Sequence, residues 1–572
     1  MPDPSSDLRP IQVFLDTKRF LETPEPKPFV PGTKDFFKDN NRGFIEHKKR
    51  LKDRVEGIAT SLRREKQPGG FIKVRQREEA LAKSHRPVGA LFTQSNHFAL
   101  VGAEHVGELL FQVTPQALDS LAGIIGTKAE ETPRKAINKK TGEEEERVSG
   151  YRSELGGVED IRLYGATDRI SFSAEQAVQW MHQPNVIGGY IVELFRPERA
   201  VSPTEVDAMI ALFRTGLNKL TGGLLVRPIL PSTASSQFGQ PTLALSISLT
   251  KDDRRLIEFP FEDDGSSPWM VESALPPTMR NVEGDLTVAR HAELLAFLAE
   301  QSLVRSVELP PVLETTPTNP GTSLGKVALQ PPRPGADYPT LGIIDGGVSE
   351  ATLAPWKVGD AGLVPPSDRD ESHGTFIAGL VSAGSLLNPP LSPMIEATGC
   401  KFYDIDLFPR RELRSRYYAD IEELFDVLDE KVKVAKRDHG VRIFNLSFSI
   451  GSRSSRLAYS LAADRLDRIA HANDVLFVVA AGNLPPASRP SWPEKAEDAA
   501  IMLASFAGDN QHLTAPAEHV LGITVGAVNP HGIAGHVPEL PTTYTRRAPG
   551  SVVPVSLTCH TLAVSILLPK PG

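Results

Sequence analysis

Apolar residues recur at nearly helical spacing in one basic segment near the start of the chain, from Phe44 to Arg64. Its apolar positions are Phe44, Ile45, Leu51, Val55, Ile58 and Leu62. Its polar side holds His47, Lys48, Lys49, Arg50, Lys52, Arg54, Arg63 and Arg64. The pattern predicts an amphipathic helix. We interpret it as a solvated helix packed on the next domain; a membrane surface or an acidic partner is the alternative that a basic helix leaves open.

Short strands and amphipathic helices alternate between Pro87 and Pro310. We expect strands over 89–93, 98–101, 189–195, 242–249 and 304–309, and helices over 115–125, 202–220 and 291–301. Ser202 and Pro203 have the residue types of a helix N-cap and of the first helical position. The charged residues 128–147 are expected to form a surface loop. The order of elements from 189 onward predicts a small α/β sandwich.

A change of composition divides the chain. Residues 310–338 are rich in Pro, Thr and Gly and lack apolar periodicity, which is typical of a linker. We therefore expect a basic, partly helical segment over 1–85 and an α+β domain over 86–309. A second domain is expected over 339–550, and residues 551–572 form a tail of different composition.

The region after the expected linker contains short, mostly apolar runs that are typical of strands buried on both faces of a parallel sheet. They are residues 341–344, 443–448, 475–480 and 522–528, with helical patterns at 373–382, 420–437 and 454–471. This alternation predicts a doubly wound α/β fold with helices on both faces of a parallel sheet. In such folds ligands bind at the carboxyl ends of the strands.

Composition and charge narrow the classes of protein. The chain has 572 residues, 40% of them hydrophobic and 23% charged, with a net charge of -8 that gives no general footprint for nucleic acid. Two cysteines, Cys400 and Cys559, do not make a disulfide scaffold. The N-terminus lacks the pattern of a secretory signal, and no apolar run is long enough to span a membrane. We therefore expect a cytoplasmic protein without a membrane span.

Three motifs bring together an acid, a base and an amide donor. Asp345 follows the apolar strand 341–344 and precedes two glycines, where a carboxylate can orient a histidine. His373 opens a predicted helix, which aims a general base rigidly. Asn483 follows the strand 475–480, where its amide can donate to a developing oxyanion. Each motif by itself is also compatible with ordinary turn chemistry, but together they indicate a hydrolase site.

The order of these motifs resembles the subtilisin-like serine proteases, or subtilases, over about residues 339–550. Their Asp motif, their His-Gly-Thr-x-x-Ala-Gly motif and their Ala-Gly-Asn motif match at Asp345, His373 and Asn483. The stretch 444–449 resembles the Asn-Leu-Ser strand that pairs with the substrate backbone, and 520–528 and 544–550 resemble later segments of the family. The resemblance implies a serine endopeptidase. We identify no cofactor and no metal site in the sequence, and calcium binding is left open. The resemblance also implies a substrate-binding strand that contains Ser447, Phe448, Ser449 and Gly451.

One part of the family pattern is not found where it is expected. The nucleophile should lie in Gly-Thr-Ser-x-Ala-x-Pro after the strand 522–528, but Ser551, Ser556 and Ser565 do not follow Gly-Thr, and prolines interrupt that segment. Truncation or out-of-frame translation after about Gly550 is one hypothesis. Two functions follow: an endopeptidase with an Asp-His-Ser triad, or an inactive subtilase that serves as a peptide-binding or interaction module.

The resemblance also bears on partners and on the N-terminal half. We expect a peptide or protein substrate. Bacterial subtilases with long N-terminal regions that work beside an ATPase make a regulatory ATPase partner an expectation. The second half of the domain over 86–309 has the element order of a subtilase propeptide, and an independent recognition domain is the alternative. No phosphate-binding glycine motif follows any predicted strand, so nucleotide-binding functions are disfavoured.

Overall fold

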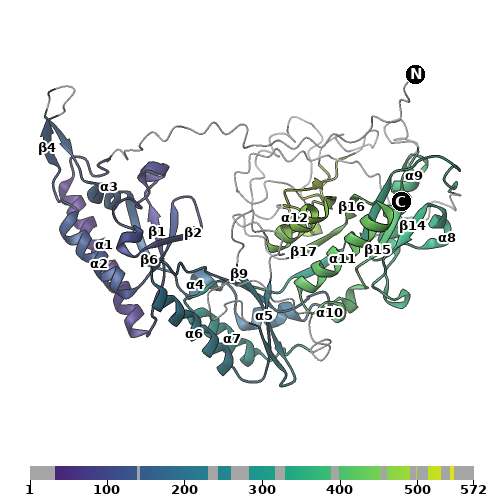
Figure 1. The fold of residues 1–572 in the computed structure, drawn as a ribbon, viewed down its shortest axis with the longest axis horizontal. Helices are drawn as coiled ribbons and strands as arrows, with labels where there is room; N and C mark the ends of the chain where they lie inside the picture. The colour runs from purple at the N-terminus through teal and green to yellow at the C-terminus, as the bar shows by residue number, and fades with distance from the viewer. Residues whose placement is uncertain are drawn as a thin grey trace.

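The computed structural model describes residues 33–137, 142, 144–229, 243–258, 283–315, 329–387, 398–451, 460–489, 498, 513–529 and 541–546. Figure 1 shows an elongated molecule, with helix α1 (Asn41–Arg64) towards one end and strand β14 (Lys357–Asp360) towards the other. Three sheets with their helices follow one another between these ends. Among the described residues, no helix has the length and apolar character that crossing a bilayer requires.

The first sheet is antiparallel, in the order β2-β3-β1-β6. Its strands are β1 (Gly70–Gln76), β2 (Ala99–Ala103), β3 (Glu108–Val113) and β6 (Val158–Leu163). Three helices complete this unit: α1, α2 (Pro115–Lys128) and α3 (Gly150–Gly157). Most of the apolar side of α1 enters a core with Phe111 and Leu118, as its sequence pattern predicts, but Ile45 is exposed.

Two residues of the predicted polar side of α1 are in fact buried. His47 Nε2 lies 3.0 Å from the carbonyl oxygen of Leu155, and Lys48 donates from Nζ to the carbonyl oxygen of Ala129 at 2.7 Å. Burial lowers the pKa of His47 to about 4. The helix therefore buries residues of its polar side as well as its apolar side, which its basic composition did not indicate.

Two local predictions for this unit were wrong. Residues 89–93 form a turn rather than a strand, and the carboxylate of Glu154 accepts hydrogen bonds from the amides of Gly89, Ala90 and Leu91. The charged stretch expected to be a loop contains a hairpin of β4 (Arg134–Ile137) and β5 (Glu144–Arg147). Neither error affects the three helices, α1, α2 and α3, that accompany this sheet.

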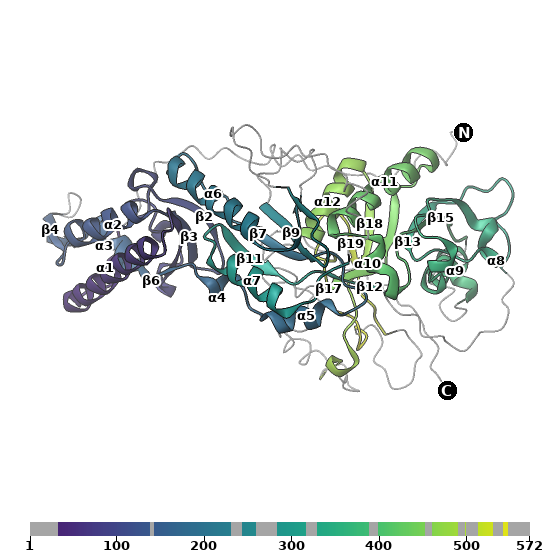
Figure 2. The ribbon, with the colours of Figure 1, turned by 90° about the horizontal axis from the view of Figure 1, so that it is seen from below.

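The second sheet has the order β10-β8-β9-β7-β11. Its strands are β7 (Tyr190–Leu194), β8 (Gly223–Ile229), β9 (Leu243–Thr250), β10 (Arg255–Ile257) and β11 (Val304–Glu308). Four helices belong to it: α4 (Ala166–Arg169), α5 (Ala174–Met181), α6 (Pro203–Lys219) and α7 (Val288–Glu300). Apolar residues of α5, α6 and α7 pack on one face of the sheet. Figure 2 shows β7 and β9 between the first sheet and the third.

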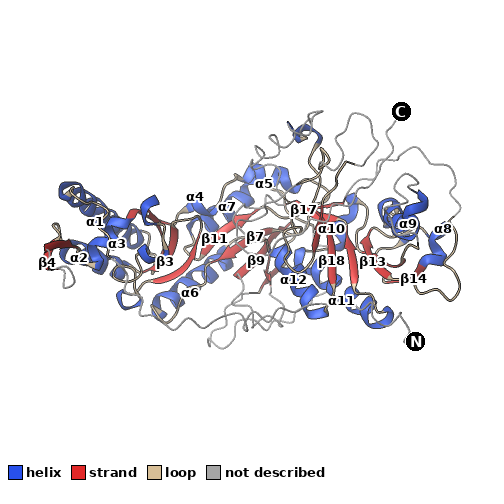
Figure 3. Cartoon of the chain, turned by 90° about the horizontal axis from the view of Figure 1, so that it is seen from above, coloured by secondary structure: helices blue, strands red, loops and turns tan. Residues whose placement is uncertain are grey.

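The third sheet is parallel, with six strands in the order β14-β15-β13-β16-β18-β19. Besides β14, these are β13 (Thr340–Asp345), β15 (Lys401–Asp406), β16 (Ile443–Leu446), β18 (Leu476–Ala480) and β19 (Ile523–Val525). They lie side by side in Figure 3. The helices are α8 (Glu350–Leu353), α9 (Ser372–Leu387), α10 (Arg414–Tyr417), α11 (Ile421–His439) and α12 (Leu461–Asn473).

Helices cover both faces of the parallel sheet, which confirms the predicted α/β class. Ile344 of β13 points into a core with α11 and α12, whereas the preceding Ile343 joins a core with α8 and α9. Strand β15 was missed by the sequence analysis because its Lys-Phe-Tyr-Asp-Ile-Asp sequence is not a continuous apolar run.

The outer face of the second sheet packs on the helices of the third. Ile191, Ile229 and Ala244 contact Leu461 at the start of α12, and Arg227 of β8 forms a buried ion pair of 2.5 Å with Asp420, the N-cap residue of α11. Strand β12 (Val312–Thr315) lies inside the stretch expected to be a linker. It pairs antiparallel with β17 (Phe448–Gly451) of the C-terminal unit.

Candidate active site

Asp345 is the last residue of β13, at the carboxyl edge of the parallel sheet. Its side chain is buried, and Oδ1 accepts a hydrogen bond from the amide of Gly346 at 2.8 Å. The turn after it needs glycine twice. A Cβ at Gly346 would lie 2.4 Å from the carbonyl oxygen of Asp370, and Gly347 has a φ of +103°, which side chains disfavour. The Asp-Gly-Gly sequence therefore closes a turn that holds the carboxylate in place.

His373 lies in the first turn of α9 and faces that carboxylate. Its Nδ1 lies 2.6 Å from Oδ2 of Asp345, within hydrogen-bond distance, and Nδ1 is the donor because an ionised carboxylate only accepts. The contact depends on Gly374, since a Cβ there would lie 2.2 Å from the carbonyl oxygen of Gly347. The structure thus brings together two of the three residues predicted to be catalytic, although they are far apart in the sequence.

The pair is arranged to favour a protonated imidazole. Burial by itself lowers the pKa of His373, but the hydrogen bond and charge of Asp345 outweigh burial, and the pKa lies above its ordinary value. An imidazole held through Nδ1 keeps Nε2 for exchanging a proton with another group. This is the geometry that a general base requires.

Two further carboxylates, absent from the sequence prediction, support the loops around this pair. Asp404 of β15 accepts a hydrogen bond from the amide of Val348 at 3.2 Å, in the turn after Asp345. Asp406 accepts from the amides of Leu363 and Val364 and pairs with Arg369. Both aspartates thus fix segments that lead into or out of the Asp345–His373 pair. In the sequence, the only sign of this role is that two aspartates flank Ile405 at the end of β15.

Asp404 is expected to make stability depend on pH. One of its oxygens, Oδ1, is buried without a hydrogen-bond partner among the described residues, and burial raises its pKa to about 7 despite the charge of Lys357. The folded protein therefore holds a proton that the unfolded chain releases near pH 4, so stability falls as pH rises from about 4 to about 7.

Asp404→Asn should remove this loss. We expect the free energy of unfolding above pH 7 to increase by about 2–4 kcal/mol, with a flatter profile between pH 4 and 7. Urea denaturation at a series of pH values measures it. Glu430→Gln is the matched control, because Glu430 is exposed on α11. A profile for Asp404→Asn with the slope of the parent protein would contradict the expectation.

Asn483 follows β18, two strands from β13 in the same sheet. Gly482 before it has a φ of +96°. Asn483 forms an isolated antiparallel β-bridge with Thr545, and beside it the amide of Leu484 donates a hydrogen bond to the carbonyl oxygen of Tyr544 at 2.6 Å. The side chain of Asn483 is exposed. Since the strands are parallel, this turn and Asp345 share the carboxyl edge of the sheet.

The predicted substrate strand is also at this edge, but another strand of the same chain already pairs with it. Phe448 and Ser449 belong to β17 and lie opposite Thr315 and Glu314 of β12, and Gly451 lies opposite Val312. Ser447, between β16 and β17, accepts a hydrogen bond from Nδ2 of Asn445 at 2.7 Å. An extended chain can evidently bind β17 by main-chain pairing.

The serines of the tail, Ser551, Ser556 and Ser565, lie outside the described residues.

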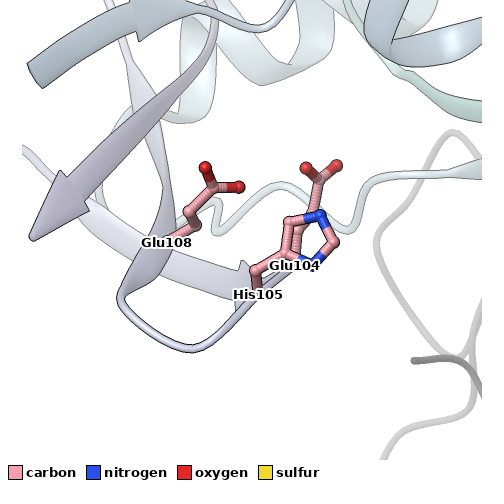
Figure 4. A group of neighbouring side chains, drawn as sticks. All are labelled: Glu104, His105 and Glu108. Atoms are coloured by element: carbon pink, nitrogen blue, oxygen red, sulfur yellow. The ribbon is translucent and has the colours of Figure 1, made fainter. Parts of the chain in front are cut away.

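Among the described residues, one cluster has side chains of the types that bind a metal ion. It consists of Glu104, His105 and Glu108, near the turn between β2 and β3, and their ligand atoms lie within 4.8 Å of one another (Figure 4). Lys73 already pairs with Glu104 there, and it lies 3.8 Å from Glu108 and 3.1 Å from Asp168. We interpret the cluster as a salt-bridge network, far along the chain from Asp345 and His373.

The C-terminal unit is thus an α/β unit with an Asp–His pair at the carboxyl edge of its parallel sheet. Residues 348–566 match the model of the Subtilase family, a range that includes His373, β17 and Asn483 and begins just after Asp345. This part of the chain is therefore similar to the Subtilase family, in agreement with its motifs. No curated protein matches the chain significantly.

Several solved structures of proteases resemble the chain. The MycP3 protease of the type VII (ESX-3) secretion system is 20% identical, with a TM-score of 0.22, over 33% of this chain and 53% of that one. MycP1 from Mycobacterium smegmatis is 15% identical, with a TM-score of 0.23, over 42% and 66%. The epidermin leader peptide processing protease EpiP from Staphylococcus aureus is 13% identical, with a TM-score of 0.27, over 60% and 70%. The chain thus spans about half of the length of the first of these.

Proposed function

We propose that this chain is a subtilisin-like serine endopeptidase. His373 serves as the general base, Asp345 orients its imidazole and stabilises the imidazolium, and Asn483 donates to the oxyanion of the tetrahedral intermediate. The observation that carries the proposal is the 2.6 Å contact between His373 Nδ1 and Asp345 Oδ2 at the carboxyl edge of the sheet. The family match and the position of Asn483 at the same edge support it.

Substrate binding is assigned to β17. Backbone groups of an extended peptide would pair with Ser447, Phe448, Ser449 and Gly451, as β12 does within the chain. We infer that β12 covers this strand in the resting protein and that the second sheet, packed on α11 and α12, acts like a propeptide. A regulatory ATPase partner rests on the sequence resemblance alone, and a cytoplasmic site of action stays an expectation from the sequence.

A fluorophosphonate probe tests the hydrolytic proposal, because it is small and reacts with an activated serine without needing β17. We expect a covalent adduct on a single serine, identified by peptide mass spectrometry, and its loss in His373→Ala. Asp370→Asn, which alters a neighbouring exposed carboxylate, is the control and should keep the adduct.

The second candidate function is that of a peptide-binding module that does not hydrolyse. The observations that favour it are the missing Gly-Thr-Ser motif after residues 522–528 and the occupied strand β17. No adduct in a sample that circular dichroism shows to be folded would reject the endopeptidase and leave this module.

A further inference from the structure

The turn that carries Asn483 is held by a segment that lies much further along the chain. Asn483 pairs with Thr545 in the isolated antiparallel bridge, and the amide of Leu484 donates to the carbonyl oxygen of Tyr544 at 2.6 Å. Residues 544–550 are a stretch in which the sequence resembles the subtilases, but no step of the proposed mechanism uses them. The described part of this stretch therefore lies directly beside the proposed oxyanion donor.

Arg546 binds two successive carbonyl groups of the turn. Its amide donates to the carbonyl oxygen of Gly482 at 3.0 Å, and its Nε donates to the carbonyl oxygen of Asn483 at 3.1 Å. The stem of the same side chain lies against the turn, since a Cβ on Gly482 would be 3.0 Å from Cδ of Arg546. A single residue thus binds the peptide groups on both sides of the Cα atom of Asn483.

These contacts fix the backbone of Asn483. The two peptide groups that flank a Cα atom define the φ and ψ angles of its residue, and these angles set the direction of the Cα–Cβ bond. Gly482 is the residue type with the greatest backbone freedom, so the peptide group that follows it needs an external partner to stay in place. The side chain of Asn483 is exposed, and the backbone therefore decides where its amide points.

From this geometry we propose that Arg546 is a positioning residue, which fixes the peptide groups around Asn483 and so directs its side-chain amide at the developing oxyanion. The inference rests on the proposed hydrolytic function and adds a residue that does not touch the substrate. The bond from Nε is charge-assisted, which makes it stronger than a bond between neutral groups. The direction of the donor matters because an oxyanion is stabilised most by donors that are already in place before the reaction.

The rate of labelling by a fluorophosphonate tests the proposal, because the phosphonyl oxygen of the adduct occupies the position of the oxyanion. Arg546→Ala removes the bond from Nε but keeps the backbone bond to Gly482. We expect the maximal rate constant of labelling to fall about tenfold in Arg546→Ala. Arg546→Lys should recover part of this loss, because its ammonium group can donate to the same carbonyl oxygen.

A double-mutant cycle with Asn483→Ala separates positioning from a general structural effect. Asn483→Ala removes the donor and should slow labelling about 10²–10³-fold. Adding Arg546→Ala should then slow it no further, because there is no amide left to direct. In samples that circular dichroism shows to be folded, equal slowing by Arg546→Ala in both backgrounds would overturn the proposal. So would a rate in Arg546→Ala equal to that of the parent protein.

Arg489 supplies the matched control. It donates from Nε to the carbonyl oxygen of Leu484 at 3.1 Å, one peptide group beyond those that flank Asn483. Arg489→Ala should therefore be labelled at the parent rate, and a loss as large as that in Arg546→Ala would contradict the special role of Arg546. No labelling of the folded parent protein would instead reject the hydrolytic proposal, and the role of Arg546 with it.

Hydrogen exchange tests the contact itself without a nucleophile. The peptide group between Asn483 and Leu484 contains both the carbonyl oxygen that Arg546 binds and the amide that donates to Tyr544. Arg546→Ala should speed exchange of the Leu484 amide several-fold relative to Arg489→Ala. Equal exchange in the two variants would show that Arg546 does not hold this peptide group, and would overturn the proposal.

Discussion

Replacing Asp345 with asparagine is expected to lower the pKa of His373 below its ordinary value and to reduce proposed peptide hydrolysis about 10⁴-fold. Asparagine keeps the size of the side chain but loses the charge that outweighs the effect of burial on the imidazole. Nuclear magnetic resonance titration of the His373 ring measures the pKa, independently of any turnover.

The same variant changes the dependence of stability on pH. Because the folded pKa of His373 is raised, the contribution of the pair to stability is fully present below the unfolded pKa of about 6.5 and is lost as pH rises through the folded pKa. Asp345→Asn should remove that contribution. The control is Asp370→Asn, whose charge has a smaller effect on His373. An unchanged titration of His373 in Asp345→Asn would show that the carboxylate does not set its pKa.

Truncating Arg227 is expected to have the largest effect on stability. Arg227→Ala leaves Asp420 buried without its partner, and breaking a buried ion pair in this way costs about 3–5 kcal/mol. Asp420 also caps α11 by accepting a hydrogen bond from the amide of Glu423 at 3.0 Å. We therefore expect the second sheet to separate from α11 at lower denaturant concentration, measured by urea denaturation and by limited proteolysis.

Two comparisons identify the cause. Arg227→Ala combined with Asp420→Asn removes the unpaired charge and keeps an acceptor for the cap, so it should recover part of the loss. Arg254→Ala removes an exposed arginine of the same unit, paired with Asp252, and should leave the transition where it is. A loss in Arg254→Ala as large as that in Arg227→Ala would show that burial of the Arg227 pair is not the reason.

The sequence was most informative where one local segment carries its own physical reason. Gly347 of the Asp-Gly-Gly turn has a positive φ that favours glycine, and His373 occupies the start of a helix whose small residues allow close packing. Strand β13 packs on both faces, whereas buried residues of β16 and β18 alternate with half-buried or exposed ones. The apolar composition of all three runs nevertheless predicted a parallel sheet.

Elements whose partners are distant in sequence were harder to predict. Strand β15 is polar at Asp404 and Asp406 because these side chains hold neighbouring loops, and no local pattern marks such a role. The burial of His47 and Lys48 depends on carbonyl groups that other segments supply. In each case the polar residue type suggests an exposed side chain, but a hydrogen bond to a distant segment offsets the free-energy cost of burying it.

By itself, the sequence determined the likeness to the subtilases, the α/β class and the candidate acid, base and amide donor, because these depend on short motifs and local periodicity. Only the tertiary structure decided that Val312–Thr315 pairs with β17. The physical reason is that strand pairing depends on which segments meet in space, which a segment of four residues in a proline-rich stretch does not encode.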